Sequence, residues 1–161
     1  MIISFILNGD DVEVRADAAR RLVDILRSDF RLTGTREGCL GGHCGACTII
    51  FNRSIVPSCL IPAFYAQGGE IVTIEGFMQT DEYKDIQKGF KEAGVENCGF
   101  CHSAKTFLAE SLLERVKLPE RDEIINTFDS VKCRCTSAKE LADAVLAAAA
   151  ARTRRLYGRT G

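Results

Sequence analysis

The feature that most constrains the fold of this chain is a run of cysteines among glycines, from Gly38 to Cys47. A fourth cysteine, Cys59, follows later in the sequence. The first three cysteines are spaced C-x4-C-x2-C, and eleven residues separate the third from the fourth. A loop that wraps a metal cluster turns several backbone N–H groups inward, and glycine reaches the positive φ angles this needs without steric cost. The spacing is typical of [2Fe–2S] sites, whereas zinc sites usually show C-x2-4-C pairs. We therefore predict a [2Fe–2S] cluster here, with zinc or disulfides as alternatives. The predicted ligands are Cys39, Cys44, Cys47 and Cys59.

Composition narrows the class of protein further. The chain has 161 residues, of which 46% are hydrophobic, which suits one domain or two small ones. A formal charge of -1 argues against nucleic acid as the main partner. No stretch resembles a signal peptide or a membrane span, so we expect a reducing cytoplasm and no membrane partner. In that compartment, eight clustered cysteines indicate metal binding more often than disulfides.

The first half of the chain predicts a small α+β unit with a ferredoxin-like order of elements. Asn8-Gly9 and Asn52-Arg53 are expected to be hairpin turns, since such turns favour residues that tolerate positive φ. Pro57 fits a strand end or an edge strand. The expected strands are 2–7, a return strand with Val12 and Val14, 48–51, 54–56, and a last strand with Ile71, Val72 and Ile74. The expected helices are 18–28 and a short one from Cys59 to about Ala66.

After Gly76 the residues become helical and charged, which predicts a bundle of four helices. The first two are expected at 83–93 and 103–115. Pro119 is expected in the first turn of the third, where its missing N–H is harmless. Ser137 and Glu140 form a capping box that begins the fourth. We therefore predict two domains, 1–76 with the first cysteine group and 77–161 with the helical bundle.

A second cysteine group lies in the helical half, where C-x2-C and C-x-C pairs precede two of the expected helices. Thiolates near helix N-termini are stabilised by the positive end of the helix dipole and by unpaired N–H groups. We predict a second [2Fe–2S] cluster here, and zinc is the alternative for this group taken alone. The predicted ligands are Cys98, Cys101, Cys133 and Cys135.

Three short motifs, in order with the first cysteine spacing, carry a family resemblance. They are CGACT at 44–48, CGFC at 98–101 and CRCT at 133–136. Over nearly its whole length the chain resembles the small iron–sulfur subunit of the molybdenum hydroxylases. These are the relatives of xanthine dehydrogenase and aldehyde oxidoreductase, and they include carbon monoxide dehydrogenase and nicotinate dehydrogenase.

The resemblance implies a β-grasp ferredoxin-like domain followed by a four-helix domain. It implies that electrons pass from molybdopterin on a large subunit to the second cluster, then to the first cluster and to FAD on another subunit. The assembly would be a heterotrimer or a dimer of heterotrimers, with no substrate site on this chain. A xanthine or purine dehydrogenase-like complex is the expectation from family frequency. Aldehyde, carbon monoxide or nicotinate-type complexes are alternatives, and so is a stand-alone two-cluster electron carrier.

The resemblance also implies contacts with the pterin, and the sequence departs from the family pattern near them. The family usually has Gln before CGFC, and the resemblance implies that Asn97 would make this pterin contact with a shorter reach. His102-Ser103-Ala104 replaces Thr-Pro-Gly after CGFC, and Ser137-Ala138 replaces Gly-Tyr after CRCT. All eight cysteines are present.

A few other residues invite a functional interpretation. His43 is expected to be a loop side chain rather than a Rieske-type ligand, because four cysteines already fill the site. His102 could tune the adjacent cluster, although a helix-start histidine without a special role is the simpler interpretation. Arg134 could donate to sulfur or be solvent-exposed. The basic tail is expected to be a frayed terminus rather than a docking segment. Its arginines are Arg152, Arg154, Arg155 and Arg159.

Overall fold

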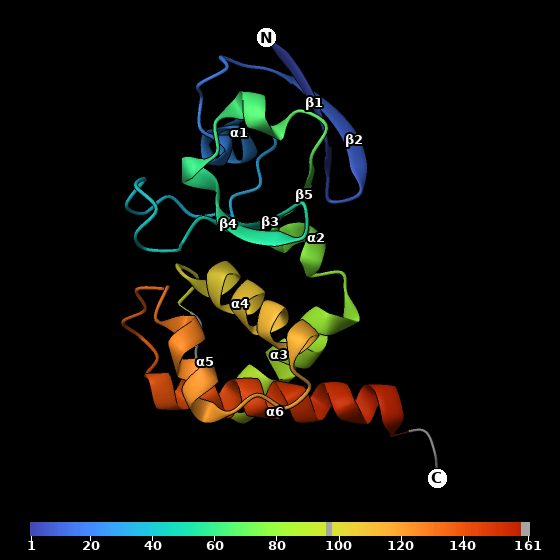
Figure 1. The fold of residues 1–161 in the computed structure, drawn as a ribbon, viewed down its shortest axis with the longest axis vertical. Helices are drawn as coiled ribbons and strands as arrows, with labels where there is room; N and C mark the ends of the chain where they lie inside the picture. The colour runs from blue at the N-terminus through green and yellow to red at the C-terminus, as the bar shows by residue number, and fades with distance from the viewer. Residues whose placement is uncertain (96–97, 159–161) are drawn as a thin grey trace.

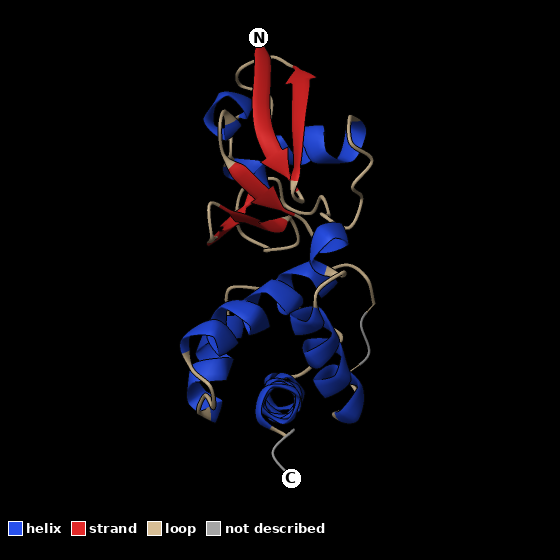
Figure 2. Ribbon diagram, turned by 90° about the vertical axis from the view of Figure 1, so that its right-hand side faces the viewer, coloured by secondary structure: helices blue, strands red, loops and turns tan. Residues whose placement is uncertain are grey.

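The computed structural model describes residues 1–95 and 98–158 and arranges them in two regions along its long axis (Figure 1). A twisted sheet with short helices forms the region that contains the N-terminus, and a group of helices forms the other (Figure 2). Each region has its own hydrophobic core. The expected α+β class is confirmed. Within the described residues, every helix is too short or too polar to span a bilayer.

The sheet has five strands in the order β2-β1-β5-β3-β4. β1 pairs antiparallel with β2 and parallel with β5, and β3 lies antiparallel between β5 and β4. Both predicted hairpin turns are confirmed, since Asn8, Gly9, Asn52 and Arg53 all have positive φ. Pro57 ends the edge strand, as expected. The strands are β1 (Ile2–Leu7), β2 (Asp10–Arg15), β3 (Thr48–Phe51), β4 (Ser54–Pro57) and β5 (Glu70–Val72).

Helix α1 (Leu22–Ser28) packs its buried face on the core of the sheet region. The sequence predicts a start at Ala18, and this is wrong by about one turn. The backbone before Leu22 pairs with a later segment instead of entering the helix. The Phe64 N–H donates to the Ala18 carbonyl, and the Leu22 N–H donates to the Ile61 carbonyl. These long-range hydrogen bonds hold residues 18–21 outside the helix.

Two other expectations for this region need correction. The helix predicted from Cys59 to Ala66 is two short 3-10 helices, η1 (Ser58–Leu60) and η2 (Ala63–Ala66). Ile61 between them is extended, because the residue before a proline is disfavoured in the helical conformation. Ile74 is not in the last strand but begins α2 (Ile74–Phe77), and its side chain lies in the helical core.

The junction between the two regions is held by the tip of the first hairpin. The Thr73 N–H donates to Asn8 Oδ1 at 2.8 Å, and Asn8 Nδ2 donates to Thr73 Oγ1 at 3.1 Å. Gly76 lies so close that an added Cβ would be 2.4 Å from Asn8 Oδ1. Asn8 therefore joins the two regions by two hydrogen bonds, and Gly76 leaves room for its side chain.

The helical region consists of the four expected helices below α2. They are α3 (Asp81–Glu92), α4 (His102–Arg115), α5 (Arg121–Phe128) and α6 (Ala138–Tyr157). The capping box predicted at the start of α6 is confirmed, with Ser137 and Glu140 each accepting the other's N–H. The sequence predicts Pro119 inside the first turn of α5, but the helix begins at Arg121 with Glu120 as its N-cap. Pro119 is buried just before the cap.

The end of α6 is bound to the bundle, and the expectation of a frayed basic tail is wrong for its described part. Arg152 pairs with Glu110 of α4 and lies 3.7 Å from the Asp85 carboxylate of α3. Arg155 Nε donates to Asp85 Oδ2 at 2.9 Å. Arg154 lies 3.7 Å from Glu92. The arginines therefore neutralise carboxylates of the bundle, while Arg159 lies outside the described residues.

Candidate metal centres

The loop before β3 aims backbone donors at the sulfur of Cys39. The N–H groups of His43, Cys44 and Gly41 lie 3.1, 3.3 and 3.4 Å from Cys39 Sγ. These donors stabilise the thiolate, and they lower the pKa of Cys39 to about 6, with the Gly41 N–H contributing most. Leu40, Gly42 and Gly45 adopt positive φ, which turns the loop around the sulfur. A sulfur so surrounded fits the role of a metal ligand.

The other three cysteines of the first group take different positions around this loop. Cys44 Sγ accepts the Cys39 N–H at 3.4 Å, so these two residues bond reciprocally. Cys47 precedes β3 and Cys59 lies in η1, and both are buried against Val23. Burial raises the pKa of Cys47 to about 11, and its thiol also interacts with Cys59. His43 is exposed, as expected of a loop side chain.

The second cysteine group gathers sulfurs from two segments that lead into helices. Cys101 is the N-cap of α4, and Cys133 and Cys135 precede α6. Their three Sγ atoms lie within 4.8 Å of one another. Cys98 Sγ lies 3.7 Å from Cys135 Sγ, so the fourth predicted residue joins the group. This sulfur-only set at helix starts fits an iron–sulfur cluster in chemistry and placement.

The sulfurs of this second group differ in their electrostatic surroundings. Burial raises the pKa of Cys101 to about 12, against the opposing influence of the positive charge of Lys105. The hydroxyl of Thr136 lowers the pKa of Cys135 to about 7. Sequence reasoning missed Lys105, which is fully buried in α4. The signal available was a lysine directly beside the apolar stripe of Ala104, Phe107 and Leu108.

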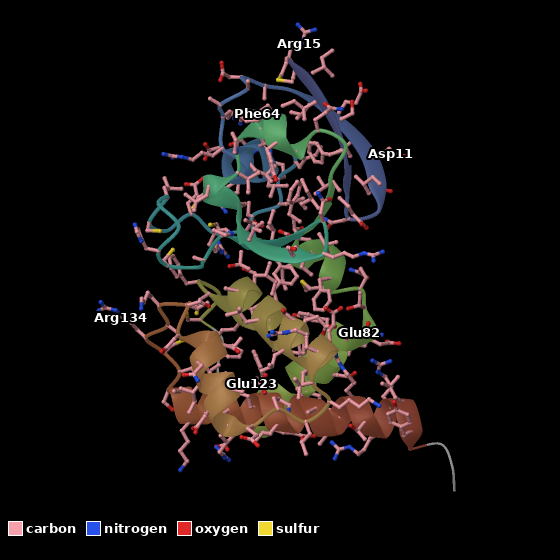
Figure 3. The ribbon with its side chains drawn as sticks, viewed as in Figure 1. Asp11, Arg15, Phe64, Glu82, Glu123 and Arg134 are labelled. Carbon is pink, nitrogen blue, oxygen red and sulfur yellow. The ribbon has the colours of Figure 1, made fainter. Side chains whose placement is uncertain are left out.

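Residues beside the second group were also singled out from the sequence. His102 Nε2 lies 3.2 Å from the Tyr83 hydroxyl of α3, and its Nδ1 is buried without a hydrogen-bond partner among the described residues. Burial lowers the pKa of His102. Arg134 is exposed and points outward from the loop before α6 (Figure 3). Asn97, the predicted pterin contact, lies outside the described residues.

The two cysteine groups are in direct contact through their loops. The Lys132 N–H donates to the Cys44 carbonyl at 3.2 Å, which joins the neighbour of Cys133 to a member of the first group. Arg36 Nε donates to the Gly99 carbonyl at 3.3 Å, between Cys98 and Cys101. The fold therefore sets the two groups next to each other at the boundary between the sheet region and the helical region.

Family models match both regions of the chain. A model described as a 2Fe-2S iron-sulfur cluster binding domain matches residues 5–69, and a model described as a [2Fe-2S] binding domain matches residues 73–146. The expected ferredoxin-like domain followed by a helical [2Fe–2S]-binding domain is thereby confirmed. The chain carries two [2Fe–2S]-binding domains.

Individual relatives are similar over most of their length. The nicotinate dehydrogenase small FeS subunit of Eubacterium barkeri is 38% identical over 81% of this chain and 83% of its own. A probable xanthine dehydrogenase subunit of Bacillus subtilis is 35% identical over 81% of this chain and 75% of its own. The crystal structure of quinoline 2-oxidoreductase from Pseudomonas putida 86 has a chain with a TM-score of 0.88 and 34% identity. That likeness covers 98% of this chain and 97% of the other.

The fold and the paired cysteine groups define a two-domain [2Fe–2S] electron-transfer protein. The chain belongs to the small iron–sulfur subunits of the molybdenum hydroxylases, which are multi-subunit oxidoreductases.

Proposed function

We propose that this chain relays electrons from a molybdopterin site on a large partner subunit to FAD on a second partner subunit. The proposed ligands are Cys98, Cys101, Cys133 and Cys135 on the molybdopterin side and Cys39, Cys44, Cys47 and Cys59 on the flavin side. Each group belongs to one proposed domain, 77–161 or 1–76. A heterotrimer, or a dimer of heterotrimers, would complete the enzyme.

The observation that carries this proposal is the contact between the two cysteine groups. When bound, the two clusters supply one-electron redox chemistry. The protein's own part is to fix their separation and surroundings. The hydrogen bond from the Lys132 N–H to the Cys44 carbonyl links the loops without an intervening side chain. A relay needs such proximity, whereas two independent structural zinc sites do not.

The surface near the first cysteine group supports a subunit rather than a free carrier. Leu60, which directly follows Cys59, is 57% exposed although it is large and apolar. Phe100, between two cysteines of the second group, is 46% exposed. Exposed apolar side chains near functional loops are typical of surfaces that other proteins cover. A free-standing two-cluster carrier would have no need to expose them.

For the substrate of the whole enzyme we propose a nitrogen-containing aromatic ring, which includes xanthine and other purines. The support comes from the names of relatives, since nicotinate, xanthine and quinoline are all such rings. Purification from the native source tests the proposal. A large molybdenum-containing polypeptide and a flavin-containing polypeptide should elute with this chain in gel filtration. Elution of the chain alone would favour the free carrier.

Cys101→Ser tests the division of ligands between the two groups. We expect loss of one [2Fe–2S] signal in the electron paramagnetic resonance (EPR) spectrum of the reduced protein, with the other signal retained and turnover abolished. Cys39→Ser is the matched variant and should remove the other signal. Loss of both signals in either variant, or zinc in place of iron on metal analysis, would show that the assignment is wrong.

A further inference from the structure

Among the described residues, Lys105 is a fully buried cation that forms no ion pair with a carboxylate. Its side chain is fully buried, yet no described carboxylate oxygen lies within 4.0 Å of its ammonium group. The buried carboxylates Asp85 and Glu110 are instead neutralised by Arg152 and Arg155 at the other end of the bundle. An isolated charge is expensive to bury, so a buried ammonium needs a negative group nearby.

The surroundings of Lys105 identify that negative group. Lys105 lies one helical turn after Cys101, and its N–H donates to the Cys101 carbonyl at 3.0 Å. Its Nζ donates to Thr136 Oγ1 at 3.3 Å. The same hydroxyl oxygen lies 3.6 Å from Cys135 Sγ. The ammonium is therefore separated from the second sulfur group by a single hydroxyl.

The direction of these hydrogen bonds follows from the donors available. A lysine ammonium only donates, so the Thr136 oxygen accepts from Lys105. The hydroxyl proton of Thr136 is then available to Cys135 Sγ. The chain of bonds runs from the buried ammonium through the hydroxyl to the exposed sulfur of Cys135. It brings positive charge toward the sulfurs from the buried side of the group, where water screens the charge less than at the surface.

We propose that Lys105 is the buried counter-charge of the second cluster and that, through Thr136, it raises the reduction potential of this cluster. The inference rests on the proposed ligand assignment. One-electron reduction adds a negative charge to the site, and a nearby cation stabilises the reduced form more than the oxidised form. Net charge and hydrogen bonds to the sulfurs are among the known controls of such potentials.

The test is an EPR-monitored redox titration of the full chain carrying both clusters. Lys105→Met keeps much of the length of the side chain and removes the charge. It should lower the equilibrium constant for reduction of the second cluster at least tenfold, which is about 59 mV for one electron. The first cluster, in the other region of the chain, is the internal reference and should keep its potential. Thr136→Val should shift the second cluster in the same direction by less.

Lys139→Met is the matched control, because this lysine is exposed at the start of α6 near the same cysteine group. Solvent and salt screen the charge of Lys139. The equilibrium constant for reduction of the second cluster should therefore change less than about twofold in Lys139→Met. The signal assigned to the second cluster is the one that disappears in Cys101→Ser.

Several outcomes decide the inference. A potential unchanged in Lys105→Met, or an equal shift of both clusters, would overturn it. If Lys105→Met failed to hold the second cluster, Thr136→Val would decide, and an unchanged potential there would overturn it. If two EPR signals are present and neither Lys105→Met nor Thr136→Val changes the reduction potentials, the role of Lys105 is wrong. The proposed function is then unaffected. A single EPR signal in the unmodified chain would contradict both the proposed function and the role of Lys105.

Discussion

At the scale of single residues, cysteines proposed for the same role lie in opposite electrostatic environments. Cys39 is exposed, and three N–H groups lower its pKa to about 6. Cys101 is buried, and burial raises its pKa to about 12. Without iron, Cys39 is therefore a thiolate at neutral pH and Cys101 remains protonated. Because metals bind the thiolate, iron bound by the proposed ligands would displace a proton at Cys101 but not at Cys39.

This difference predicts the order in which the iron-free chain reacts with iodoacetamide. In a short pulse at about pH 7.5, Cys39 should be alkylated first and Cys135, whose pKa is lowered to about 7, second. Lowering the pH through about 6 should suppress labelling of Cys39, because its thiolate takes up a proton below its pKa. Peptide mass spectrometry reports each site. Equal labelling of all eight cysteines would show that the loop has lost its arrangement.

The candidate sites could be predicted from the sequence because cysteine spacing is a local property of the chain. The spacing predicts two groups of four, and the structure gathers Cys98, Cys101, Cys133 and Cys135 as expected. Lys105 was missed because its meaning depends on Thr136, thirty-one residues away, and on burial by the bundle. The apolar stripe beside Lys105 signals its burial, but nothing near it in the sequence identifies Thr136 as its partner.

At the scale of elements, the closest packing in the helical region is between α3 and α6. Gly89 of α3 lies against the backbone of α6, where an added Cβ would be 2.3 Å from the Ala148 nitrogen and 2.5 Å from the Ala144 carbonyl oxygen. Backbone atoms cannot rotate away as a side chain does. The absence of a side chain at Gly89 therefore allows α3 to approach the backbone of α6 at Ala144 and Ala148.

Gly89→Ala should consequently destabilise the chain, although alanine is the better helix former. In an open helix this change would stabilise by about 1 kcal/mol. Here overpacking should lower the free energy of unfolding by about 2 kcal/mol. Denaturant unfolding followed by circular dichroism measures it. Lys88→Ala, on the exposed face of the same helix, should be nearly neutral. An increase in stability for Gly89→Ala would show that the helices do not approach so closely.

Turns decided by their own residues were predicted well, whereas helix ends held by distant partners were not. The break at Ile61 before Pro62 is a local signal that the prediction of a single helix overlooked. The turns at Asn8-Gly9 and Asn52-Arg53 depend on the conformations of those residues alone. The start of α1 depends instead on hydrogen bonds to the segment around η2, and the end of α6 depends on Asp85 and Glu110. The residues near these helix ends do not reveal such long-range partners. Hydrophobic periodicity therefore starts α1 too early, and the basic composition of the tail suggests a frayed terminus.

At the scale of the whole molecule, the loops of the two cysteine groups hold the regions together on one side. Gly45 has a φ of +75°, and an added Cβ there would lie 3.0 Å from Val131 Cγ2 and 3.3 Å from the Ser130 carbonyl oxygen. The loop of the first group thus packs on the segment that leads into Cys133. This contact and the Lys132–Cys44 hydrogen bond fix the separation of the proposed clusters.

Gly45→Ala should push these loops apart and weaken communication between the clusters. We expect weaker magnetic interaction between the two reduced clusters in the EPR spectrum. Gly68→Ala is the control, because Gly68 also has positive φ, +69°, but nothing lies within 4 Å of its added Cβ. Both variants should lose about 1 kcal/mol to backbone strain. An unchanged magnetic interaction in Gly45→Ala would mean that this contact does not set the separation.

The junction held by Asn8 has a consequence for recombination between relatives. Asn8 and Thr73 are joined by two hydrogen bonds although 65 positions separate them, and Gly76 leaves room for the asparagine. A chimera that joins the helical half of this chain to the sheet of another subunit at residue 73 would meet a foreign hairpin tip. Unless that hairpin tip has an asparagine in the position of Asn8, the chimera loses the two hydrogen bonds that join the sheet region to the helical region. The natural unit of exchange is therefore the helical half together with the turn near the beginning of the chain.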